Sequence, residues 1–128
     1  MTDATSRPVF DHARIAEQND AFRRHVCLGG PWPEDMQPLA GRLDITDNVL
    51  VRGQLFTNTC LRTTGFHNSF PKDADPNGIH AFGVFRICDV EVWWKLDCYD
   101  QAYERGADDP ADPSRTARVL TILLPLDW

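Results

Sequence analysis

The residues best suited to chemistry are a histidine, a lysine and two aspartates in the second half of the chain. Lys95 and Asp97 are two positions apart, so on a strand both side chains point to the same side. Asp100 follows where a loop begins, and His80 precedes them. Carboxylates with an imidazole can move protons or hold a divalent ion, with the lysine as an electrophile. One hypothesis is therefore a small hydrolase or nuclease that uses His80, Lys95, Asp97 and Asp100.

The same side chains have a simpler interpretation as ion pairs on a half-solvated sheet face. No serine stands in a G-x-S-x-G context, and no glycine-rich loop could cradle a phosphate. The histidines and cysteines are too scattered to assemble a zinc ligand set by spacing alone. The leading expectation is therefore a protein with no catalytic residue, no metal and no cofactor.

The charge of the chain is unevenly distributed. The 128 residues include 19 acidic and 13 basic side chains, for a net charge of −6. Residues 89–112 hold eight of the acids and only two of the bases, whereas the rest of the chain is balanced. A general nucleic-acid binder would show a basic patch or a high pI, so direct binding of nucleic acid is not expected.

This acidic stretch is a candidate surface for a partner protein that has a basic surface of its own. Trp93 lies on the polar side of the same predicted strand, and an exposed tryptophan beside charges is a candidate anchor. Charge complementarity of this kind speeds association and sets orientation. A solvated loop and a homodimer interface at the Trp93 face are the alternatives. The candidate partner-binding residues are Trp93, Asp97, Asp100, Glu104, Asp108, Asp109 and Asp112.

The N-terminal third predicts one helix. It is expected to begin after Asp11, whose side chain can cap it, and to end before Gly29-Gly30-Pro31. Apolar residues recur inside it at nearly helical spacing. Residues 1–9 are expected to be a mobile lead-in. The expected solvent face of the helix holds Arg14, Glu17, Arg23 and Arg24.

The middle of the chain is harder to interpret. Residues 42–46 alternate polar and apolar side chains, as a short strand does. Residues 49–66 fit either a strand or a helix, and Gly53 and the threonines weaken the helix. Prolines and a glycine predict a loop over residues 67–78.

The last third predicts a β-hairpin followed by a buried strand. Residues 80–88 and 90–99 alternate, with Asp89 as the turn, and Trp94 is expected in the core. Residues 118–124 are nearly all apolar, which suits a central strand covered on both faces. We therefore expect a single α+β domain over residues 1–128. Its N-terminal helix and a second, uncertain helix would pack on a mainly antiparallel sheet of about four strands.

The cysteines and the apolar runs indicate a cytoplasmic protein. Cys27, Cys60, Cys88 and Cys98 lie within or beside apolar residues and are expected to be buried free thiols. The longest apolar runs are too short to span a bilayer, and the N-terminus lacks an apolar signal core.

Four blocks of the sequence together resemble a known family, DUF3768, a domain of unknown function. The blocks are residues 19–24, 75–83, 94–100 and 109–124, in that order. The chain departs from the family pattern at residues 49–70, at Ile79, where a glutamate usually precedes the histidine, and at Cys98, where an aromatic is usual.

The resemblance implies bacterial origin, often on mobile elements, and brings no established activity, cofactor or catalytic residue. Small proteins in such settings are frequently anti-restriction or anti-CRISPR factors. The leading hypothesis is therefore a non-enzymatic, protein-binding inhibitor of a bacterial defence or nucleic-acid-processing complex that uses the acidic surface. The alternatives are the hydrolase or nuclease and a structural dimerisation module.

Overall fold

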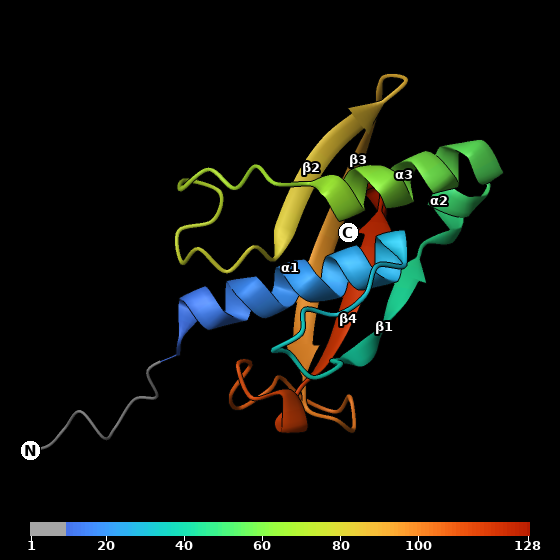
Figure 1. The fold of residues 1–128 in the computed structure, drawn as a ribbon. Helices are drawn as coiled ribbons and strands as arrows, with labels where there is room; N and C mark the ends of the chain where they lie inside the picture. Colours follow the sequence, from blue (N-terminus) through green and yellow to red (C-terminus); the bar gives the residue numbers. More distant parts are fainter. Residues whose placement is uncertain (1–9) are drawn as a thin grey trace, which may run out of the picture.

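Two layers make up residues 10–128, the part of the chain that the computed structural model describes (Figure 1). The helices α1 (His12–Leu28) and α3 (Gln54–Phe66) lie across one face of a four-stranded sheet. A short helix, α2 (Asp47–Leu50), leads into α3. The α+β class predicted from the sequence is confirmed, whereas the expected mobility of residues 1–9 lies outside the described residues.

Helix α1 begins and ends at the predicted residues. The Asp11 carboxylate accepts a hydrogen bond from the backbone N–H of Arg14 at 3.1 Å, which caps the helix. Gly29 takes the left-handed conformation, with φ at 74°, and closes the last turn on the carbonyl of His25. One prediction for this helix is wrong. Arg23, expected on the solvent face, is fully buried because it faces α3.

Residues 49–66, for which the sequence allowed either a strand or a helix, are helical except for the short connection at residues 51–53 between α2 and α3. The hydroxyl groups of Thr57 and Thr59 donate to the carbonyls of Gly53 and Leu55, four residues earlier. These bonds satisfy the hydroxyl groups of Thr57 and Thr59 within the helix, so these two threonines are compatible with α3. Gly53 precedes the helix with φ at 102°, a conformation that side chains rarely adopt.

The sheet is mixed and mostly antiparallel. Its strands are β1 (Ala40–Ile45), β2 (Phe82–Ile87), β3 (Val90–Tyr99) and β4 (Ala117–Leu123), in the spatial order β1-β4-β3-β2. The β2–β3 and β3–β4 pairs are antiparallel, and β1 pairs with β4 in parallel. The predicted central strand is therefore confirmed as β4, which is buried along almost its whole length.

The β2–β3 hairpin follows the predicted alternation. Val92, Trp94 and Leu96 point toward the helices and are buried, so Trp94 belongs to the core as expected. Cys88 and Asp89 form the turn, both with positive φ, as tight hairpin turns of the mirror-image type require. This turn exposes Cys88, so the prediction that all four cysteines are buried is wrong for Cys88.

The exposure of the cysteines leads to a labelling prediction. Burial raises the pKa of Cys27 to about 12 and that of Cys60 to about 11, and it also raises the pKa of Cys98. The thiolate is the reactive form, so these three thiols should react slowly in the folded protein. Mass spectrometry after brief iodoacetamide treatment should show a single modification at Cys88. The denatured protein, as control, should take four. Equal labelling of Cys27 and Cys88 in the folded protein would contradict the packing of α1.

No helix within residues 10–128 is both long and apolar enough to cross a membrane.

Candidate partner-binding surface

The sheet face opposite the helices carries an aromatic cluster, which consists of Phe82, Trp93 and Trp128. The ring centroids of Trp93 and Trp128 lie 5.7 Å apart, and those of Phe82 and Trp93 lie 5.6 Å apart, both in edge-on geometry. Such pairs add about 0.5–1.5 kcal/mol beyond the area they bury. Phe82 and Trp128 are exposed, and Trp93 is half-buried. The cluster therefore presents ordered rings to solvent, and Trp93 points to the side that the alternation predicts.

Charged side chains surround the aromatic cluster on the same face. The Lys95 Nζ lies 2.9 Å from the Asp97 carboxylate and 5.6 Å from the ring of Trp128. The indole N–H of Trp93 donates to the Glu91 carboxylate at 2.8 Å. Exposed pairs of this kind contribute roughly 0–1 kcal/mol to stability. Their main effect here is to orient Trp93 and Lys95.

The acidic loop, residues 100–112, is ordered by its own carboxylates. Asp100 accepts from the backbone N–H of Glu104 at 2.9 Å, and Asp109 accepts from that of Ala111 at 3.1 Å. Bonds from the hydroxyl and the backbone N–H of Ser114 lower the pKa of Asp112. These carboxylates therefore act as hydrogen-bond acceptors that hold the loop in shape.

Two further acids of the loop point to solvent. Asp108 is 81% exposed and lies 3.5 Å from Arg115, and Glu104 is also exposed. The candidate residues from position 97 to 112 thus lie along the end of β3 and the loop that follows it, as the sequence predicts. The sequence could not show that most of them also make local bonds.

The four residues of the hydrolase or nuclease hypothesis do not form one site. His80 lies on the helix side of the sheet, where it pairs with Asp20 of α1. Lys95 and Asp97 pair on the opposite face, and Asp100 bonds to its own loop. Within residues 10–128, no three His, Cys, Asp or Glu side chains come together in a group that could hold a metal ion.

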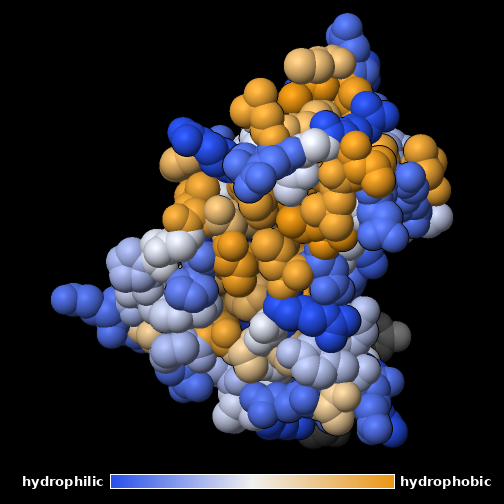
Figure 2. All heavy atoms as spheres, turned by 90° about the vertical axis from the view of Figure 1, so that its right-hand side faces the viewer, coloured by the Kyte–Doolittle hydropathy of each residue, from blue (hydrophilic) through white to orange (hydrophobic). Residues whose placement is uncertain are grey.

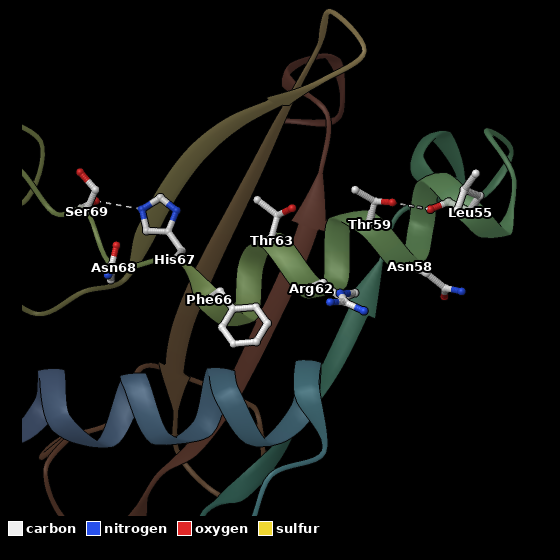
Figure 3. A pocket seen from close by; sticks show the side chains of 9 residues that line it. All are labelled: Leu55, Asn58, Thr59, Arg62, Thr63, Phe66, His67, Asn68 and Ser69. Atoms are coloured by element: carbon white, nitrogen blue, oxygen red, sulfur yellow. Dashed lines mark hydrogen bonds between the residues drawn. The ribbon is translucent and has the colours of Figure 1, made fainter.

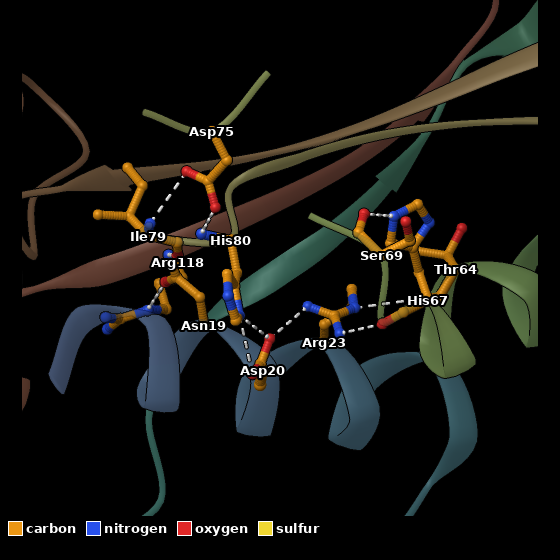
Figure 4. A network of polar contacts seen from close by, with 10 residues as sticks. All are labelled: Asn19, Asp20, Arg23, Thr64, His67, Ser69, Asp75, Ile79, His80 and Arg118. Carbon is orange, nitrogen blue, oxygen red and sulfur yellow. Dashed lines mark hydrogen bonds and ion pairs between the residues drawn. The ribbon is translucent and has the colours of Figure 1, made fainter. Parts of the chain in front are cut away.

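The structure instead pairs His80 with a carboxylate that the sequence did not single out. Both oxygens of Asp20 lie 3.0 Å from the His80 Nδ1, and the imidazole stacks on Phe70 at 4.0 Å (Figure 4). Asp75 accepts from the backbone N–H groups of Ile79 and His80, which holds His80 at a positive φ of 58°. The imidazole is therefore fixed between α1 and the loop before β2.

Asp20 also pairs with the buried Arg23. Figure 4 shows the guanidinium and His80 reaching the same carboxylate from opposite sides. Arg23 also donates to the carbonyl oxygens of Thr64 and His67 at 3.0 and 2.7 Å. These carbonyls lie at the C-terminal end of α3, which has no basic residue in its last turn. Burial lowers the pKa of Arg23, and Asp20 opposes this shift.

A second buried guanidinium, that of Arg118 in β4, packs against polar side chains of α1. It donates to Asn19 at 2.8 Å and to Gln18 and the carbonyl of Pro110 at 3.0 Å each. No ion pair is found for it among the described residues, and burial lowers its pKa. Arg118 therefore joins α1, β4 and the acidic loop, a role that its place in an apolar strand did not reveal.

A hollow with a volume of about 830 Å³ runs along α3. Figure 3 shows its side chains spread around the helix rather than converging on one point. Burial lowers the pKa of His67 at one end, and its Nε2 lies 2.8 Å from the carbonyl of Ser69. No carboxylate lines this hollow, so it offers His67 no acid–base partner.

These features define a small α+β protein whose buried polar residues join its layers and whose open sheet face is aromatic and charged. The chain belongs to the family described as protein of unknown function (DUF3768), whose family model matches residues 45–127. The matched part runs from Ile45, the last residue of β1, to Asp127, and α1 precedes it. Comparison with curated proteins and with solved structures finds no match.

Proposed function

We propose that this protein is a non-enzymatic binding protein of the bacterial cytoplasm that inhibits a defence or nucleic-acid-processing complex, in the manner of anti-CRISPR or anti-restriction factors. It docks through the acidic loop and the aromatic cluster onto a basic surface of that complex. The observation that carries this proposal is the ordered acidic loop at one end of an open sheet face with exposed rings.

The order of this surface favours binding. Side chains and loops that must be immobilised on association reduce affinity, and each rotamer-rich side chain costs about 0.5–1.5 kcal/mol. The acidic loop is already held by hydrogen bonds to Asp100, Asp109 and Asp112. Tryptophan is also among the residues that most often supply binding energy at protein interfaces. Trp128, with 73% of its surface exposed, is available to a partner.

The sign of the charge indicates the kind of partner. Residues 97–112 contain six acids and one base. Protein surfaces that bind nucleic acid are basic. A basic surface of this kind on a partner would be complementary in charge to the acidic loop. Duplex DNA carries one charge per roughly 1.7 Å, so these acids match only a short part of a nucleic-acid path. The contact with the acidic loop is therefore local, and the aromatic cluster, which lies farther along β3, would supply a separate apolar contact.

Neutralising three acids of the loop should weaken inhibition. In the triple variant D108N/D109N/D112N, the amides can still accept the local hydrogen bonds, so the loop should keep its shape. Loss of three rim charges, at up to about 1 kcal/mol each, should raise the inhibitory concentration about tenfold. It should also flatten the salt dependence. The assay is DNA cleavage by a panel of purified CRISPR effector complexes and restriction enzymes, with increasing NaCl.

A matched variant controls for the change in net charge. E34Q/D35N/D73N removes three exposed acids outside the acidic loop and the aromatic cluster, and it should inhibit like the wild type. Equal inhibition by the wild type and the D108N/D109N/D112N variant would remove the acidic loop from the binding surface. No inhibition of any complex in the panel would count against the inhibitor function itself.

A further inference from the structure

The outward edge of β1 is open. The strand pairs with β4 on one side only, at the end of the sheet. Among residues 10–128, no group outside β4 forms a hydrogen bond with the backbone of β1. The other edge strand differs, because the loop before β2 lies beside it and encloses with it a hollow of about 230 Å³. An open strand edge is a template for pairing with another strand.

The register shows which backbone groups face outward. The N–H of Thr46, directly after β1, donates to the carbonyl of Ile122 in β4. Backbone N–H and C=O directions alternate along a strand, so Arg42 and Asp44 also point theirs toward β4. Gly41, Leu43 and Ile45 therefore present their N–H and C=O groups at the open edge.

We propose that two copies of this chain pair through this edge as antiparallel strands, with the two-fold axis at Leu43. Leu43 then lies opposite Leu43 of the second copy, and Gly41 lies opposite Ile45. This register joins every outward N–H and C=O of these three residues in hydrogen-bonded pairs. The two sheets become one continuous sheet, and the contact is isologous, as a two-fold dimer requires.

The charges of β1 are self-complementary in this register. Arg42 and Asp44 point to the uncovered face and are 55% and 45% exposed, and they pair within the strand at 3.2 Å. Antiparallel pairing about Leu43 places Arg42 of each copy opposite Asp44 of the other. Opposite charges at such positions stabilise a sheet, and like charges destabilise it. The parallel arrangement would instead place like charges side by side.

Apolar side chains lie on the same side of the molecule. Figure 2 looks at the side on which β1 and the α2–α3 corner lie, and hydrophobic side chains form a continuous patch across its middle. Leu50, Val51 and Leu55 of this corner are exposed, Val51 and Leu55 by about four-fifths of their surface. Large exposed apolar patches mark interaction sites. A second copy at the β1 edge would cover part of this patch.

A charge-swap series tests the proposed dimer by sedimentation velocity over a range of protein concentrations. The wild type should be a dimer. Arg42→Asp and Asp44→Arg should each be monomeric, because each places like charges opposite one another. The double variant R42D/D44R restores opposite charges across the two-fold axis and should be a dimer again.

Two further measurements keep the result interpretable. Val84 is exposed on the uncovered face of β2, so Val84→Glu should leave a dimer through β1 intact. The same substitution should disrupt a dimer that forms through the sheet face carrying Trp93. Amide exchange at Gly41, Leu43 and Ile45 should slow as the wild-type concentration rises. A monomeric wild type, a dimer that survives Arg42→Asp, or exchange independent of concentration would each overturn the proposal. None of these outcomes bears on inhibition by the acidic loop.

Discussion

Asp20→Ala should lower the free energy of unfolding by about 3 kcal/mol, since removing one partner of a buried ion pair typically costs 3–5 kcal/mol. The Arg23 guanidinium is fully buried, and Asp20 is the carboxylate that pairs with it, at 3.0 Å. The substitution also leaves the His80 Nδ1 without its acceptor. The expected result is a positive charge trapped between α1 and α3, which chemical denaturation at neutral pH would measure.

Glu17→Ala is the matched control for this variant. Glu17 is an exposed acid on the same helix, so its removal should change stability by less than about 0.5 kcal/mol. Amide exchange adds a second readout. Asp20→Ala should speed exchange in the last turn of α3, whose carbonyls Arg23 binds. A loss below about 1 kcal/mol for Asp20→Ala would show that Arg23 is hydrated, contrary to the structure.

Gly41→Ala should destabilise the protein by about 3 kcal/mol, at the upper end of the usual cost of overpacking. A Cβ at Gly41 would overlap the carbonyl oxygen of Arg118 and lie 2.7 Å from ring carbons of Phe22. The oxygen belongs to the backbone of β4, so it cannot move aside as a flexible side chain would. The β1–β4 pair must therefore separate or Phe22 must shift out of the core. Thermal unfolding followed by circular dichroism would measure the loss.

Gly30→Ala is the control for the glycine substitution. A Cβ at Gly30 would have open space around it, so the change should be neutral or slightly stabilising. Equal melting temperatures for the two variants would mean that β1 does not approach β4 as closely as the structure shows.

Local patterns predicted the elements that depend on local chemistry. Asp11 and Gly29 define the ends of α1, because capping and the left-handed turn involve residues only a few positions apart. The period-two alternation of β3 predicted the faces of the sheet to which Trp93 and Trp94 point. Successive side chains of a strand point to opposite faces, so the position of a residue in the strand determines its face. These predictions required no knowledge of the rest of the fold.

Contacts between distant parts of the chain were not predictable in this way. Arg23 resembles a solvent-facing residue in the pattern of α1, and only the carbonyls of Thr64 and His67 make it a buried one. The helix over residues 54–66 was ambiguous because its threonines favour strands by propensity, and tertiary packing overrode that preference. The spacing of residues along one element cannot reveal such contacts, since they join separate elements.

The candidate surface was predicted in part. The acids from Asp97 to Asp112 lie where the sequence placed them, along the end of β3 and its loop. Phe82 and Trp128 were not singled out, because they reach Trp93 only through the hairpin register and the turn after β4. The pairing of His80 with Asp20 was missed for the same reason, since α1 and the loop before β2 are far apart in sequence.

The central position of β4 also has a consequence for biosynthesis. β4 joins β1 to β3, yet it follows both of them along the chain. On the ribosome, the hairpin and the helices emerge before the strand that links them, so β1 has no partner at that stage. Pairings between distant segments form slowly, and unpaired strand edges are prone to aggregation. The nascent chain therefore stays incompletely folded until β4 emerges, and this interval is when a chaperone would be needed.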